Sequence, residues 1–91
     1  MAFDEKGTIA QARSDLARRL AVDENEITEG LVEPAEFRDG ALGAPVEDEM
    51  SAQVITPGWR IHLKANDKTY EYRASDRQMR LFNFNGENYR I

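Results

Sequence analysis

Two alternating segments, 59–64 (WRIHLK) and 69–73 (TYEYR), decide the fold of this chain. An Asn-Asp pair lies midway between them, and a two-residue turn there sets two apolar pairs opposite each other: Leu63 with Tyr70, and Ile61 with Tyr72. The other face then carries Arg60, His62 and Lys64 beside Thr69, Glu71 and Arg73. This pattern predicts an antiparallel hairpin that is covered on one face and polar on the other.

Length and composition indicate one globular domain. With 91 residues, the chain can form a single core that removes about 60% of the surface of the unfolded chain from water. Hydrophobic residues make up 41% and charged residues 32%, which is ordinary for a folded domain. We therefore expect residues 1–91 to form one domain with a flexible N-terminus at residues 1–7.

Charge and hydropathy restrict the partners. The chain has 17 acidic and 12 basic residues and a net charge of -5, so its surface repels a phosphate backbone and nucleic acid is not expected. No run of about 18 apolar residues occurs, so no membrane partner is expected, and residues 1–7 are too polar for a signal peptide. The cytoplasm is the default expectation, and a removed leader would leave an exported origin open. Cysteine is absent, which excludes disulfides and thiolate chemistry.

The N-terminal part predicts a helix that begins where Thr8 can cap it and Gln11 can reach back. The helix should end near Ala21, before a polar cluster at residues 23–26. Its apolar stripe docks on a sheet and consists of Ile9, Ala12, Leu16 and Leu20.

A first strand is expected at residues 27–37, at an edge of the sheet because Pro34 donates no ladder hydrogen bond. Asp39-Gly40 suits a tight reversal, and residues 42–51 are expected to form an exposed loop. A short strand at 52–56 should lead into Pro57-Gly58, which suits either a turn or a kink within one long strand.

After the hairpin, a turn at residues 75–77 precedes a strand at 78–84, and Asn85-Gly86 can reverse the chain into a tail strand at 88–91. The sequence therefore predicts an α+β domain, with one N-terminal helix packed on a four- to five-stranded antiparallel sheet.

The register of the last long strand decides which aromatic residues are exposed. A two-residue turn at Ser75 and Asp76 sets Met79 opposite Tyr72, and the alternation then places Phe82 on the other face. A three-residue turn with a bulge reverses this and brings Phe82 inside. We favour the first register. It predicts a binding patch with three aromatic anchors inside a polar surround: Phe82, Phe84 and Tyr89, with His62, Glu71 and Arg80.

His62 is the single histidine, and an active-site role would require partners that the sequence does not supply. Metal sites need three or four ligands, and the acidic run at 47–49 lacks the spacing of a calcium loop. We interpret His62 as a surface residue paired across strands with Glu71. No catalytic residue, no metal site and no cofactor are therefore predicted.

Several short motifs resemble those of a group of uncharacterised bacterial proteins. In that group an aromatic residue precedes Asp-Gly, a Leu-Gly-Cys-Pro loop follows, and Thr-Pro-Gly-Tyr leads to Tyr-Glu-Tyr. Here these places hold Phe37, Asp39-Gly40, 42–45 (LGAP), 56–59 (TPGW) and 70–72 (YEY), with Ala44 in place of the cysteine. More distantly, the order of elements resembles PepSY-type domains, for which an inhibitory or chaperone-like role is proposed.

These observations predict a non-enzymatic module that binds a protein or peptide, through the uncovered sheet face, an edge strand or the 42–51 loop. A homodimer that joins the aromatic patches is equally compatible. The alternative, implied by the resemblance, is a PepSY-like peptidase inhibitor or intramolecular chaperone.

Overall fold

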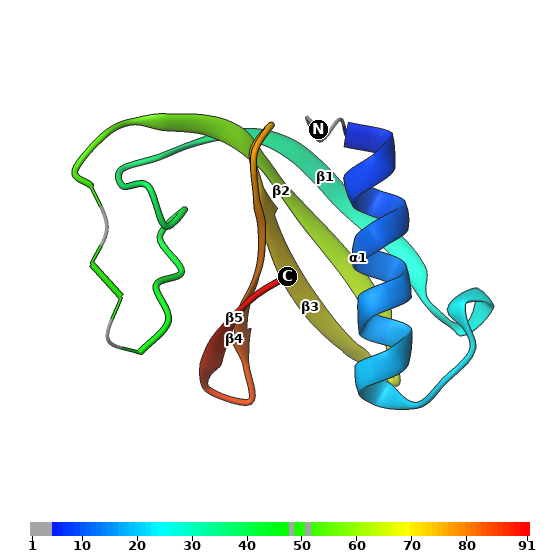
Figure 1. Ribbon diagram of the computed structural model, residues 1–91. Helices are drawn as coiled ribbons and strands as arrows, with labels where there is room; N and C mark the ends of the chain where they lie inside the picture. Colours follow the sequence, from blue (N-terminus) through cyan, green and yellow to red (C-terminus); the bar gives the residue numbers. More distant parts are fainter. Residues whose placement is uncertain (1–4, 48, 51) are drawn as a thin grey trace.

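The computed structural model describes residues 5–47, 49–50 and 52–91. It consists of one helix, α1 (Glu5–Leu20), a short 3-10 turn, η1 (Glu24–Glu26), and five strands: β1 (Thr28–Phe37), β2 (Thr56–Ala65), β3 (Lys68–Ala74), β4 (Met79–Phe84) and β5 (Glu87–Arg90). The strands form one antiparallel sheet in the order β1-β2-β3-β4-β5. Figure 1 shows α1 on one side of the sheet and the connection between β1 and β2 on the other. The predicted α+β architecture is confirmed.

The helix begins at Glu5, so the cap predicted at Thr8 is wrong. Thr8 lies one turn inside α1, where its buried hydroxyl accepts a 2.8 Å hydrogen bond from the Trp59 indole. The N-terminus predicted to be flexible covers residues 1–7. Residues 1–4 lie outside the described residues, and residues 5–7 are helical.

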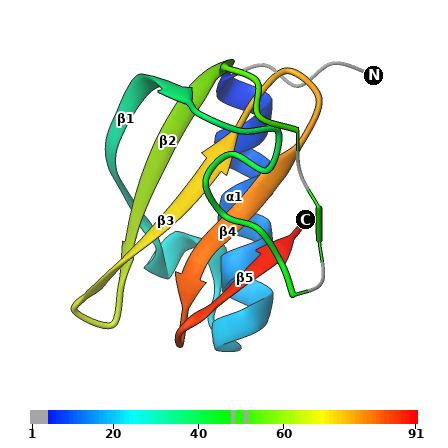
Figure 2. The same ribbon diagram turned by 90° about the vertical axis from the view of Figure 1, so that its left-hand side faces the viewer.

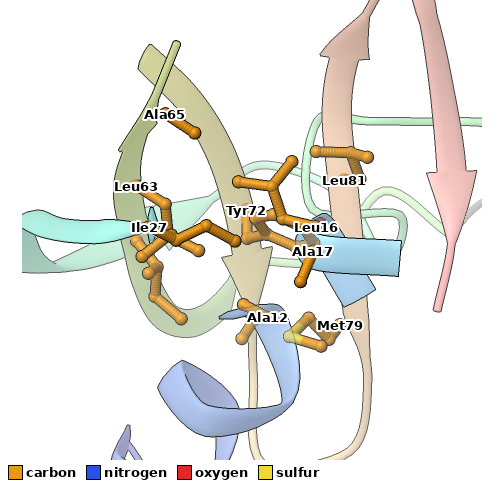
Figure 3. Packing of buried hydrophobic residues seen from close by; sticks show 11 residues of the cluster. Ala12, Leu16, Ala17, Ile27, Leu63, Ala65, Tyr72, Met79 and Leu81 are labelled. Carbon is orange, nitrogen blue, oxygen red and sulfur yellow. The ribbon is translucent and has the colours of Figure 1, made fainter. Parts of the chain in front are cut away.

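The core lies between α1 and the inner face of the sheet. Figure 3 shows Leu16 and Ala12 of the helix against Tyr72, Leu81 and Met79 of β3 and β4. All five side chains are almost fully buried. Alternation along the strands places these residues on one face, as the sequence predicts.

The β2-β3 hairpin has the predicted register, with Leu63 opposite Tyr70 and Ile61 opposite Tyr72. Its turn residues Asn66 and Asp67 have φ values of 52° and 62°, as a two-residue turn between right-twisted strands requires. Asparagine and aspartate tolerate this left-handed conformation, so the turn chemistry and the apolar pattern agree.

The strand predicted at residues 52–56 is wrong, because β2 begins at Thr56 and continues without interruption through Pro57 and Gly58. Of the two alternatives, the one long strand is therefore present. Gly58 pairs with Ala35 of β1 and lies against Ala74 of β3, where a Cβ atom would overlap the Ala74 carbonyl oxygen. Glycine at this place lets the two backbones approach.

The first part of β4, residues 79–82, keeps the predicted faces but not the predicted pairing. Met79 lies opposite Ala74, and Leu81 lies opposite Tyr72, two residues away from the expected partners. The connection between β3 and β4 is four residues long, 75–78. It is closed by a hydrogen bond from the Ser75 N–H to the Gln78 carbonyl oxygen at 2.9 Å. A shift of two residues preserves which side chains face inward.

A bulge near the end of β4 changes the faces of the last residues. The pairing with β5 shifts between Leu81 and Phe84, and Asn83 in between has a φ of 53°. The extra residue reverses the alternation, so Phe84 turns toward the helix side while Phe82 stays on the other side.

The connection between β1 and β2 is the predicted exposed loop only in part, because Leu42 and Ala44 are buried whereas residues 43, 45, 47 and 50 are exposed. Residues 39–47, which we call the strap, cross the outer face of the sheet in front of β3 and β4 (Figure 2). Ala41, Leu42 and Ala44 of the strap are fully buried. Residues 48 and 51 of the predicted loop lie outside the described residues.

Candidate binding surface

The aromatic anchors predicted at Phe82, Phe84 and Tyr89 do not form one patch. The Phe82 ring lies on the outer face, 3.7 Å from the guanidinium carbon of Arg73. The rings of Phe84 and Tyr89 pack against the core on the helix side, with centroids 6.0 Å apart. The guanidinium of Arg19 lies 4.5 Å above the Tyr89 ring. The three predicted anchors are thus divided between two faces and do not share one surface, whereas their role in binding stays a prediction.

His62 and Glu71 lie opposite each other, as predicted, with Nε2 3.4 Å from the Glu71 carboxylate. Nδ1 of His62 is 3.2 Å from the Leu31 carbonyl oxygen of β1. Glu71 also accepts a 2.6 Å hydrogen bond from Arg73 and lies 3.7 Å from Arg60. Each side chain therefore has partners within the sheet, and the pair links three strands.

Arg80, predicted to belong to the polar surround of the patch, is buried beneath the connection between β1 and β2, with 3% of its surface exposed. Its guanidinium makes two hydrogen bonds of 2.5 and 2.6 Å to the Glu49 carboxylate, and a third to the Ala44 carbonyl oxygen at 3.2 Å. The hydrogen bonds from Arg80 lower the pKa of Glu49 from 4.5 to about 2, against a smaller opposing effect of burial. Arg80 therefore serves to hold the connection in place.

The strap is fastened to the sheet through its own backbone. Side chains on the outer face donate to five of its carbonyl oxygens: Arg73 to Leu42 and Gly43, Gln78 to Gly40, Arg80 to Ala44, and Asn88 to Pro45. The distances lie between 2.6 and 3.2 Å. The bonds to Gly40, Leu42 and Ala44 satisfy carbonyl groups that are partly or fully buried, and those to Gly43 and Pro45 lie at the surface. The sequence predicts that this outer face is uncovered. In the structure the strap covers it over β3 and β4.

No signal in the sequence predicted this cover, and the need for it follows from the observed register of β3 and β4. Arg73 and Arg80 lie directly opposite each other on the outer face. Two like charges at such a pair are unfavourable unless acceptors come from elsewhere. In this molecule Glu71 accepts from Arg73 within the same strand, and the other acceptors are strap carbonyl groups and Glu49. These other acceptors are distant in sequence, so a local pattern could not predict them.

The free edge of β1 is the extended surface that remains. β1 is ten residues long and pairs on one side with β2, and no described strand lies on its other side. Figure 2 shows β1 as the outermost strand. Its bulge carries Leu31, which is 59% exposed. Backbone N–H and C=O groups along such an edge are available to another strand.

A hollow of about 570 Å³ opens at the C-terminal end of β1. It is lined by residues of both ends of the long connection: Glu36, Phe37, Arg38, Gln53 and Ile55. Ile55 is 70% exposed, and its neighbour Val54 is 51% exposed. Exposed apolar side chains therefore lie at this end of β1.

The described part of the chain contains neither a metal-ligand cluster nor a membrane-spanning helix. Across residues 5–47, 49–50 and 52–91, no three His, Asp or Glu side chains come together as a metal ion requires. None of the helical segments in this part has the length and apolar character to span a bilayer.

The fold and this surface define the protein as a small helix-backed antiparallel sheet with one face strapped and one long edge free. The chain belongs to the family described as Domain of unknown function (DUF8738), whose model matches residues 9–82. The match begins within α1, includes β1, the strap, β2 and β3, and ends within β4. Neither a curated protein nor a solved structure matches the chain. The more distant resemblance to PepSY-type domains stays a prediction.

Proposed function

We propose that this domain is a non-enzymatic module that binds a protein or peptide by adding a strand to the free edge of β1. The observation that carries the proposal is the contrast between the two candidate surfaces. The outer face is closed by the strap, whereas all ten residues of β1 form an edge. Strand addition at an exposed edge is a common way of binding extended peptides.

The details of β1 support this proposal. Main-chain hydrogen bonds to an edge provide affinity, and side-chain contacts on alternate positions provide specificity. Leu31 and Ile55 supply apolar contacts at the two ends of the edge. Pro34 lacks an N–H, so the ladder formed by a partner would be interrupted near the middle. The edge is therefore selective about which strand it accepts.

Site-specific photocrosslinking tests the proposal. A photoreactive amino acid replaces Leu31 in one variant and Lys68, at the exposed tip of the β2-β3 hairpin, in the control. After irradiation in extracts of the source cells, we expect a discrete adduct from position 31 and none from position 68. Equal adducts from both positions, or none from position 31, would contradict binding at the edge. The adduct mass also separates a second copy from a different partner.

A further inference from the structure

We infer that the strand recognised by β1 is positively charged, with lysine or arginine residues beside the edge and apolar residues at its ends. This inference rests on the proposed function and specifies the partner of the same site. It is drawn from the distribution of charge, from the free carboxylates of β1 and from the apolar groups that flank them.

The negative charge of the molecule is concentrated around β1. Residues 23–39 contain seven of the 17 acidic residues and one of the 12 basic residues. The rest of the chain holds ten acidic and eleven basic residues, so it is nearly neutral. The field at this edge therefore attracts a cationic segment and repels an anionic one.

Three carboxylates follow the edge itself. Glu29 and Glu36 lie on the helix side of β1, opposite Leu63 and Pro57, and Glu33 lies on the outer side, opposite Arg60. β1 contains no basic residue. An added strand places its side chains about 4.5–5.5 Å from those of β1, which is within reach of lysine and arginine. Both faces of an incoming strand would thus meet a carboxylate.

These carboxylates are available to a partner. Within the described residues, Glu29 and Glu36 have no ion-pair partner, and Glu33 has a long contact of 3.9 Å with Arg60. The Arg60 side chain is also shared with Glu71 at 3.7 Å. By contrast, Glu49 and Asp15 are each bound by arginine at 2.7 Å or less. Glu29 and Glu36 are therefore among the acidic residues that folding leaves without an ion pair in the described part of the chain, and Glu33 is held only by a long contact.

The same charges disfavour a second copy of this chain at the edge. If two β1 strands paired antiparallel, the Glu29, Glu33 and Glu36 side chains of one would lie among those of the other. Like charges across strands are destabilising, and acidic edges are one way by which proteins avoid self-association. A heterologous cationic strand has no such cost.

Peptide binding monitored by NMR tests the inference. The probe is a ten-residue peptide of valine and threonine with four lysines, and the matched probe carries glutamate in place of each lysine. With the ¹⁵N-labelled protein, we expect the lysine peptide to shift amide signals of residues 28–37, with affinity that falls as salt rises. The glutamate peptide should leave these signals unchanged.

A pair of triple variants separates edge charge from total charge. Glu29→Gln, Glu33→Gln and Glu36→Gln together should weaken binding of the lysine peptide about tenfold. The control triple changes three exposed acidic residues elsewhere and removes the same total charge: Glu47→Gln, Asp67→Asn and Asp76→Asn. It should bind nearly as well as the wild type.

The outcomes distinguish this inference from the proposed function. If both peptides shift the β1 signals equally, or if the two triple variants weaken binding equally, the charge preference is wrong while strand addition stands. If neither peptide shifts the β1 signals, this inference is overturned and the proposed function loses its support.

Discussion

Asp15 and Arg80 are ionisable side chains with only 3% of their surface exposed, and each fixes one layer of the molecule to the sheet. Asp15 of α1 accepts hydrogen bonds of 2.7 Å from the Tyr72 hydroxyl, Arg18 and Arg19. Arg80 of β4 holds the strap and Glu49. Both charges are compensated by hydrogen bonds, as burial requires.

The Tyr72 hydroxyl is predicted to stabilise the docking of α1. Tyr72→Phe leaves Asp15 without its bond to the sheet, and we expect a loss of about 1.5–3 kcal/mol in the free energy of unfolding. Burial and the adjacent Asp15 both raise the pKa of Tyr72, so the hydroxyl remains a donor at alkaline pH. Urea denaturation measures the loss.

Tyr89→Phe is the matched control for this change. Its hydroxyl donates to Glu87 at the surface at 3.2 Å, so the change should cost less than about 0.5 kcal/mol. Equal losses for the two variants would show that the Tyr72–Asp15 bond does not hold the helix.

The Glu49–Arg80 pair should give the folded state a defined dependence on pH. Because the folded-state pKa of Glu49 is about 2, below its ordinary 4.5, its contribution to stability is present in full above pH 4.5. The contribution decreases as the pH falls from there toward 2. We expect Glu49→Gln to be less stable than the wild type at pH 6, and the difference to narrow by pH 3.

Urea midpoints at several pH values between 6 and 3 provide the measurement. Glu47→Gln is the control, since Glu47 is exposed, and its difference from the wild type should be small and should not follow the same course. A Glu49→Gln difference that stays constant with pH would argue against the bond to Arg80.

At the scale of the elements, the features that depend on local sequence patterns were predicted from the sequence. The β2-β3 register followed from the Asn66-Asp67 turn together with the alternation of apolar residues. The helix, the edge position of β1 and the inward face of β4 followed in the same way. The start of α1 was missed because Thr8 serves as a buried acceptor for Trp59. Tertiary contact here overrode a local capping signal.

Features that depend on distant partners were not predictable in this way. The reversal of Phe84 results from a bulge at Asn83, and no local rule required a bulge there. Residues 42–51 were expected to form an exposed loop because they are rich in turn-forming and acidic residues. The burial of Leu42 and Ala44 in this segment depends on arginine side chains about 30 residues away, which bind their carbonyl groups.

The close approach of β2 to the end of β3 at Gly58 should make the stability of the fold sensitive to one added methyl group. A Cβ atom at position 58 would overlap the backbone oxygen of Ala74, which cannot move without breaking the sheet. We expect Gly58→Ala to cost about 3 kcal/mol or more, or to prevent folding. Far-UV circular dichroism and urea denaturation report either result.

Gly40→Ala tests the same chemical change where there is room. The nearest atoms to a Cβ at position 40 are 3.8 Å away, which is ordinary contact. We expect a change of less than about 1 kcal/mol, because the alanine fits and also restricts the unfolded chain. If Gly58→Ala were as stable as Gly40→Ala, the close approach of β2 and β3 would be wrong.

At the scale of the whole molecule, the two sides of the sheet and its two edges have different roles. The inner side is covered by α1, and the outer side is closed over β3 and β4 by the strap (Figures 1 and 2). Most of the excess negative charge lies along β1 and the segment before it. This asymmetry leaves the acidic edge as the surface on which binding is proposed.

Solvent accessibility measured by NMR tests this arrangement most directly. A soluble nitroxide broadens signals of groups that it can approach, and we predict strong broadening of the Leu31 methyl signals with little effect on those of Leu42 or on Arg80 Nε–H. The contrast follows from the free edge of β1 and the strap bound over the outer face. Strong broadening of Leu42 and Arg80 together with protection of Leu31 would contradict the account.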